Sequence, residues 1–123
     1  MNQALAAIHD YYKAFSTLNL DACAPFFSMP CMFVGNRGTF AVAGREDLAK
    51  VLGQTIEALR ATDYQRSVFV DPEFTAITEN AVLVLGVAVR YRSSGTETAR
   101  IPIGYLMHQT EAAWKIAVVA SAQ

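Results

Sequence analysis

Among the residues whose types could do acid–base chemistry, Tyr11 and His108 are the best candidates. The imidazole of histidine titrates near neutral pH, so His108 is a candidate for moving protons. Its partner would be the hydroxyl of Tyr11 or a carboxylate such as that of Asp63. A lone histidine in a strand is also typical of a structural residue that is held by hydrogen bonds. We therefore keep an acid–base hypothesis and a structural one side by side.

Other kinds of reactive site find little support in the spacing of residues. The two histidines and two cysteines do not occur in metal-ligand spacings such as C-x-x-C or H-x-x-x-H, so we expect no metal. There is no glycine-rich phosphate loop and no serine nucleophile elbow, and we expect no cofactor. Cys23 and Cys31 are expected to be free, mostly buried thiols.

The composition indicates one small domain, residues 1–123, that is rich in apolar residues. Hydrophobic residues make up 53% of the chain and charged residues 17%, and the formal net charge is −1. No block of like charge supplies the electric field that nucleic-acid binding needs. A small monomer has too little interior to bury so many apolar side chains. We therefore expect that some of them line an apolar cavity or a subunit interface. No signal peptide and no membrane span are visible, so we expect a cytoplasmic protein without a membrane partner.

The first 61 residues show the periodicity of helices that would position these side chains. The first helix carries both Tyr11 and Tyr12, whose side chains diverge because successive residues of a helix turn by about 100°. One ring is expected to point into a cavity and the other to pack under a sheet. Asn19 is a candidate cap for a short second helix. Residues 45–61 predict a third helix of about four turns.

From residue 64 onward the apolar pattern has a period of two, which predicts three or four antiparallel strands. A short hairpin with its turn at residues 36–38 is predicted before the third helix. Helices followed by an antiparallel meander predict an α+β fold, with a curved sheet that has helices on one face. Both faces of the strand at residues 81–92 are largely apolar. One face would cover the helices and a cavity, and the other would meet a second subunit.

This order of features resembles the nuclear transport factor 2-like superfamily, whose members include SnoaL-like and ketosteroid isomerase-like proteins. The resemblance rests on YYKAFSTLNLDACAPFFSMPCMFVG at residues 11–35, on GREDLAKVLGQ at residues 44–54, and on the four-strand C-terminal half. It covers nearly the whole chain. It implies a cone-shaped, cystatin-like α+β fold, in which a strongly curved, mostly antiparallel sheet wraps around three N-terminal helices. It also implies a pocket at the open end and a homodimer formed through the outer face of the sheet.

The resemblance allows one enzyme activity to be tested against the residues. Ketosteroid isomerases use a carboxylate base after the first strand, a tyrosine on the first helix and a protonated acid on a late strand. Tyr11 matches the tyrosine, but Gly35 and Gly104 stand at the two carboxyl positions. We therefore do not expect that mechanism, and the sequence leaves open whether the protein is an enzyme. A SnoaL-like lyase, isomerase or cyclase would instead use His108 and Tyr11.

Gly104 also raises a structural question, because it interrupts a predicted strand at residues 101–108. If the even-numbered residues of this strand face the cavity, then it is lined by Pro102, Gly104, Leu106 and His108, and the missing side chain widens the pocket. The alternative is a β-bulge or close packing under the first helix.

Our first hypothesis is a protein that binds a small hydrophobic molecule in an apolar cone cavity, with Tyr11, Asn36 and His108 as polar anchors. The second is the SnoaL-like enzyme, and the third is an association domain without a ligand. The other predicted lining residues are Phe15, Phe27, Phe33, Ile56, Leu85, Val87, Gly104, Leu106 and Trp114.

Overall fold

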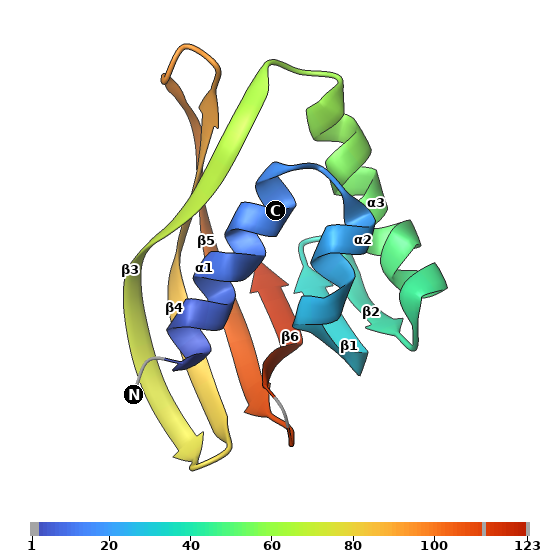
Figure 1. Cartoon of the computed structure of the whole chain (residues 1–123), viewed down its shortest axis with the longest axis vertical. Helices are drawn as coiled ribbons and strands as arrows, with labels where there is room; N and C mark the ends of the chain where they lie inside the picture. The colour runs from blue at the N-terminus through green and yellow to red at the C-terminus, as the bar shows by residue number, and fades with distance from the viewer. Residues whose placement is uncertain (1–2, 112, 123) are drawn as a thin grey trace.

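A computed structural model describes residues 3–111 and 113–122, which form three α-helices and six strands (Figure 1). The helices are α1 (Gln3–Ser16), α2 (Leu20–Cys23) and α3 (Arg45–Arg60), and a 3₁₀ turn, η1 (Ala24–Phe26), follows α2. The strands are β1 (Phe27–Gly35), β2 (Gly38–Val42), β3 (Tyr64–Thr78), β4 (Ala81–Arg92), β5 (Glu97–Gln109) and β6 (Trp114–Ser121). The predicted α+β class is confirmed.

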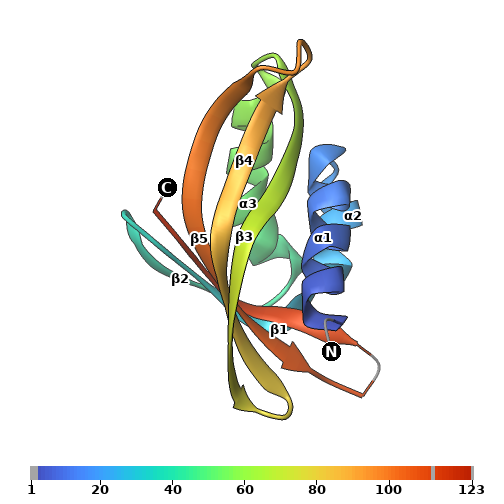
Figure 2. The same ribbon diagram turned by 90° about the vertical axis from the view of Figure 1, so that its left-hand side faces the viewer.

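The strands form one sheet in the order β2-β1-β6-β5-β4-β3. Strand β1 pairs with β6 in parallel, and the other neighbouring strands of the sheet pair antiparallel. The sheet is strongly curved, and the helices lie on its concave side (Figure 2). This arrangement confirms the predicted curved, mostly antiparallel sheet. The core of the protein therefore lies between the concave face and the helices.

The local sequence explains how the helices begin and what they bury. The Asn19 side chain accepts hydrogen bonds from the backbone N–H groups of Asp21 and Ala22, as the predicted cap of α2 should. Helix α3 buries a stripe of apolar residues at helical spacing and places acidic residues in its first turn, where they complement the helix dipole. The Arg60 guanidinium donates to the Leu18 carbonyl and ties the end of α3 to the α1–α2 turn. In the described residues, no helix combines the length and apolar character needed to cross a membrane.

The convex face of the sheet is apolar as well. Strand pairing aligns a row of side chains across five strands of this face: Leu83, Leu106, Val118, Met32 and Ala41. We call this the convex row. Beside it, Leu85 is 47% exposed and Val34 is 37% exposed. Neither helices nor loops of the described chain cover these two side chains, so the sheet presents apolar surface on the side away from its core.

Gly104 lies on this convex face, directly opposite Leu85 on β4. A Cβ atom on residue 104 would lie 2.8 Å from the Leu85 Cδ2 atom, which is too close. Both of our explanations from the sequence are therefore wrong. The glycine does not widen a pocket or pack under α1, and the β4–β5 register is regular there. Its missing side chain makes room for the Leu85 side chain to lie across β5.

Candidate functional site

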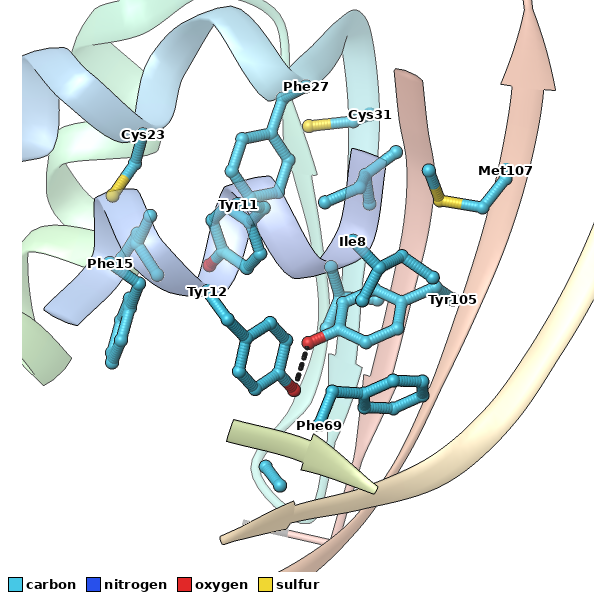
Figure 3. Close-up of a cluster of buried hydrophobic side chains, with 14 of the residues drawn as sticks. Ile8, Tyr11, Tyr12, Phe15, Cys23, Phe27, Cys31, Phe69, Tyr105 and Met107 are labelled. Carbon is cyan, nitrogen blue, oxygen red and sulfur yellow. Dashed lines mark hydrogen bonds between the residues drawn. The ribbon is translucent and has the colours of Figure 1, made fainter. Parts of the chain in front are cut away.

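Three buried tyrosines meet on the concave side, between α1 and β5 (Figure 3). The hydroxyl oxygens of Tyr12 and Tyr105 lie 2.7 Å apart and share a hydrogen bond. The Tyr11 ring stands edge-on to the Tyr12 ring, with the ring centroids 5.7 Å apart. The Tyr11 and Tyr12 side chains do diverge: Tyr12 packs toward the sheet at Phe69, and Tyr11 packs toward Phe27. Both rings nevertheless belong to the core, so neither projects into open space.

Phe69 closes this cluster from β3, and a glycine on β4 makes its position possible. The Phe69 ring centroid lies 5.5 Å from that of Tyr12 and 5.6 Å from that of Tyr105. A Cβ atom on Gly86 would lie 2.5 Å from Phe69 Cζ and 2.9 Å from the Val70 carbonyl oxygen. The ring therefore lies directly against the backbone of β4. The sheet thus uses a glycine on each face, Gly86 beneath an aromatic ring and Gly104 beneath a leucine.

Burial fixes the protonation state of the three tyrosines. Desolvation is the largest cause that raises the pKa of Tyr11, Tyr12 and Tyr105 above the usual value. Their hydroxyls therefore stay neutral at physiological pH and act as hydrogen-bond donors or acceptors rather than as bases. The bond between Tyr12 and Tyr105 uses one of their two hydroxyl hydrogens. The second hydrogen is not used by this bond.

A set of hydroxyl groups joins the end of α1 to β3 beside this cluster. The Ser67 backbone N–H donates to Ser16 Oγ at 3.0 Å, and Ser16 Oγ donates to the Tyr12 carbonyl at 2.8 Å. The hydroxyl of Tyr64 and Ser67 Oγ lie 2.7 Å apart. These contacts hold the C-terminal turn of α1 against the concave face.

Arg90 is the cation of this region. It lies opposite Ser67 in the β3–β4 pairing, and it shares the concave face of β4 with Val84 and Ala88, which are buried in the core. The guanidinium is partly buried, and desolvation lowers its pKa. Its positive charge in turn favours the ionised form of the neighbouring tyrosines and opposes part of their pKa rise. Arg90 was missing from our predicted site, although strand alternation placed it on the same face as Val84 and Ala88.

The concave face has no buried acid or imidazole to act as a base. All eleven aspartates and glutamates lie in the described residues; ten are exposed, and Asp47 is partly exposed. The Asp47 carboxylate accepts a hydrogen bond from the Ala43 N–H at the start of α3. Both histidines, His9 and His108, are exposed. The core side of the sheet therefore contains hydrogen-bond donors, from arginine and tyrosine, without a carboxylate to remove a proton.

The structure separates His108 from Tyr11. On β5 the odd-numbered residues Tyr105 and Met107 fill the core, so the even-numbered Gly104 and His108 lie on the convex side. Our prediction that the even-numbered residues face the concave side is wrong. The odd-numbered residues do so, and every side chain of β5 therefore lies on the face opposite to the one predicted. His108 lies opposite Ala81 and Lys115 at the end of β5, exposed to solvent. An acid–base pair of His108 and Tyr11 is therefore not formed.

The other predicted lining residues divide between the two faces. On the convex face, Leu85 and Val87 lie opposite Gly104 and Pro102, and Leu106 belongs to the convex row. Asn36 lies in the β1–β2 turn, where its side-chain amide donates to the Ala122 carbonyl. The concave side contains the remaining members: Tyr11, Phe15, Phe27 and Ile56 in the buried core, and Phe33 and Trp114 packed partly exposed against it.

Two open clefts lie away from the tyrosine cluster. One, of about 430 Å³, lies between α1, η1 and the start of β6, with Phe26 and Trp114 in its wall. The other, of about 370 Å³, lies between the α1–α2 turn and α3. Charged residues of both signs line each cleft, Asp10 and Lys115 in the first and Glu57 and Arg60 in the second. Of the predicted lining residues, Trp114 lies in the wall of the first cleft and Ile56 in that of the second, so neither cleft brings the predicted set together.

The two cysteines are free and buried, as predicted. Burial raises the pKa of both the Cys23 and the Cys31 thiol to about 11, so neither forms a reactive thiolate at neutral pH. Within residues 3–111 and 113–122, no three side chains of His, Cys, Asp or Glu come together as a metal site requires.

Comparison with known structures supports the fold. An NTF2-like protein with a cystatin-like fold from Novosphingobium aromaticivorans is 18% identical and has a TM-score of 0.78, with 98% of this chain and 79% of that chain covered. An NTF2-like protein of unknown function from Shewanella oneidensis is 15% identical with a TM-score of 0.77, covering 99% and 98% of the two chains. A ketosteroid isomerase-like protein from Erwinia carotovora is 16% identical with a TM-score of 0.74, covering 98% and 93%.

At these identities the likeness shows the fold alone. No curated protein matches this chain. The family of NTF2-like proteins designated DUF6841 matches residues 2–123, which is nearly the whole sequence. The chain therefore belongs to this NTF2-like family.

Proposed function

We propose that this protein binds a small, largely apolar molecule on the concave face of its sheet and does not transform it. The observation that carries the proposal is the set of partly exposed apolar side chains on that face, next to the neutral tyrosines of the core, with no buried Asp, Glu or His side chain beside them in the described chain. Such a lining, mostly apolar with a few polar groups, is typical of small-molecule sites. Proton transfer would need a base, and none lies among the buried residues described above.

The contact surface would be formed by apolar side chains that pack against the core but stay partly exposed. They come from α3 and from the strands that share its side of the sheet: Phe33, Val51, Leu59, Ile101 and Ile103. We call them the concave apolar surface. An apolar ligand that covers them would gain about 25 cal/mol for each Å² removed from water.

The proposal includes self-association through the convex face. The convex row and the exposed Leu85 form apolar surface across several strands, and such contiguous patches mark interaction sites. A second copy of the chain would remove this surface from water. The resemblance to the nuclear transport factor 2-like superfamily also implies a homodimer that uses this face.

Native mass spectrometry of the purified protein tests both parts at once. We expect the mass of a dimer plus a small molecule, which extraction under denaturing conditions would release for identification. A dimer that carries no added mass, and that also fails to bind apolar probes, would contradict the ligand part and favour the association-domain hypothesis. A monomer would contradict the proposed interface.

A charge placed on the convex face tests the interface directly. Leu85→Glu should convert the dimer to a monomer in sedimentation velocity, because it would bury a carboxylate between the two sheets. Phe74→Glu is the matched control: Phe74 is 37% exposed and lies opposite the buried Val84, on the concave side of β3. This variant should remain a dimer. Equal behaviour of the two variants would refute the convex-face interface.

A further inference from the structure

The open cleft between α1, η1 and the start of β6 has the size of a small-molecule site. Its volume of about 430 Å³ lies within the range of ligand pockets. The α1 wall of the cleft is formed by Gln3, Ala6, Ala7 and Asp10, whose spacing places them on one face of the helix. The two alanine side chains are small, and they therefore leave room between α1 and the opposite wall.

Aromatic side chains form part of that opposite wall. Phe26 of η1 and Trp114 of β6 both line the cleft, and both are partly exposed while they pack against the core. Aromatic rings offer a large apolar contact area to a ligand, and the indole of tryptophan adds an N–H donor. The apolar part of a ligand would therefore lie between these rings and the alanines of α1.

Two opposite charges line this cleft without meeting each other. Asp10 and Lys115 both belong to its walls, but the ion pairs found among the described residues include neither of them. The Lys115 ammonium donates a hydrogen bond to the Pro25 carbonyl, and it has two further hydrogens to donate. Within residues 3–111 and 113–122, the Asp10 carboxylate forms no hydrogen bond or ion pair. Both charges therefore remain accessible to a molecule that enters the cleft.

We propose that this cleft binds a small zwitterion, a free amino acid with an apolar or aromatic side chain. Its ammonium group pairs with Asp10, its carboxylate accepts a hydrogen bond from Lys115, and its side chain contacts Phe26 and Trp114. The inference concerns binding alone, and no bond is made or broken. The cleft shares no residue with the concave apolar surface, so this second site does not depend on the ligand proposed there.

The charges of the cleft favour a zwitterion over a ligand with a single charge. A purely cationic ligand would face the charge of Lys115, and a phosphate or another anion would face that of Asp10; like charges repel. The cleft beside α3 differs in this respect. There the Arg60 guanidinium lies 3.2 Å from the Glu57 carboxylate and also donates to the Leu18 carbonyl, so its charges are already paired within the protein.

Trp114 is the only tryptophan of the chain, so its fluorescence reports directly on this cleft. L-Phenylalanine, phenethylamine and 3-phenylpropanoate are matched probes, because they share a phenylethyl body and carry both charged groups, the ammonium alone or the carboxylate alone. Titration of the full chain at about pH 7, where amines and carboxyl groups are ionised, gives the three affinities. We expect L-phenylalanine to bind about fivefold more tightly than either other probe, as one solvent-accessible ion pair predicts.

Variants assign each charge of the ligand to one side chain. Asp10→Asn should weaken the binding of L-phenylalanine about fivefold without weakening that of 3-phenylpropanoate. Lys115→Gln should weaken the binding of L-phenylalanine without weakening that of phenethylamine. Asp63→Asn is the matched control, because it removes the same charge from a residue that lies outside the cleft wall and accepts a hydrogen bond from Ser93. Thermal unfolding of each variant establishes that it is folded.

Three results would overturn the inference. If none of the probes changes the Trp114 fluorescence in a saturable way, the cleft is not a ligand site. Equal affinities for the three probes would show that the charged groups do not contribute. Equal effects of Asp63→Asn and Asp10→Asn would show that the ligand responds to the overall charge of the protein and is not held by Asp10.

Discussion

The hydrogen bond between Tyr12 and Tyr105 gives a quantitative test of the core described above. Replacing either tyrosine by phenylalanine removes one hydroxyl and leaves the other buried without its partner. A buried polar group left unsatisfied costs about 1–3 kcal/mol. The rings themselves stay, because Phe has the same aromatic framework, so packing against Phe69 changes little.

The double variant Tyr12→Phe with Tyr105→Phe should cost much less than the sum of the single variants. It removes both hydroxyls, so only the net worth of the hydrogen bond is lost, about 0.5–1.5 kcal/mol. With singles of about 2 kcal/mol each, the coupling energy is about 2.5–3.5 kcal/mol, at the upper end of the usual range for residues in contact. In a domain of this size a change of 1 kcal/mol moves Tm by about 3–5 °C.

Urea unfolding followed by circular dichroism, at one fixed protein concentration, measures the four free energies of unfolding. Tyr12→Phe combined with Tyr91→Phe is the control cycle, because Tyr91 is partly exposed and lies on the convex face. The control cycle should be additive. Additive costs in the Tyr12–Tyr105 cycle would refute the buried pair and the orientation of α1 on the sheet.

Three further predictions concern packing and titration. Gly86→Ala should destabilise the protein by about 1–3 kcal/mol, because the new Cβ atom meets a fixed aromatic ring and a backbone carbonyl. Gly104→Ala should be nearly neutral, because its Cβ atom meets only the end of a mobile leucine side chain. Equal losses of unfolding free energy for the two variants in urea would contradict this. Cys23 and Cys31 should react with Ellman's reagent only after unfolding, and fast reaction of the native protein would overturn their placement. The free energy of unfolding should fall as pH rises above about 10, by about 1.4 kcal/mol per pH unit for each buried tyrosine. The reason is that the tyrosines ionise there in the unfolded chain, whereas in the folded chain their raised pKa values keep them neutral. Equal urea midpoints at about pH 9 and pH 11 would contradict this.

The order of the elements was predictable from the sequence because it depends on long, regular patterns. Apolar spacing defined α1 and α3, and the change to a period of two predicted three or four C-terminal strands, of which the structure has four. The cap at Asn19 and the turn at residues 36–38 follow from side-chain chemistry that acts locally. These features determine a fold without specifying a site.

The predicted site failed where it depended on which face of one strand is buried. In β5 both alternating sets of residues are largely apolar, so hydrophobicity does not distinguish Gly104, Leu106 and His108 from Tyr105 and Met107. An error of one residue moves every side chain of a strand to the other face. The contact of Tyr105 with Tyr12 on α1, which decides the face, joins residues 93 positions apart and has no local signal.

Arg90 shows the opposite case, in which the local signal was present. Alternation placed Arg90 on the same face as Val84 and Ala88, and the structure has it there. Because arginine is usually exposed, residue type alone assigns Arg90 to the solvated surface. A residue type at odds with its neighbours on a buried face is informative, because a charged side chain that is partly removed from water needs polar partners there.

The central claim is that the concave face is where a ligand binds, and chemical-shift mapping of the 15N-labelled protein during titration with decanoate tests it most directly. We predict that the amide signals of Phe33, Val51, Ile101 and Ile103 shift in a saturable way, while those of residues on the convex row change little. Saturable shifts confined to the cleft around Phe26 and Trp114, or no shifts at concentrations well below micelle formation, would contradict the claim.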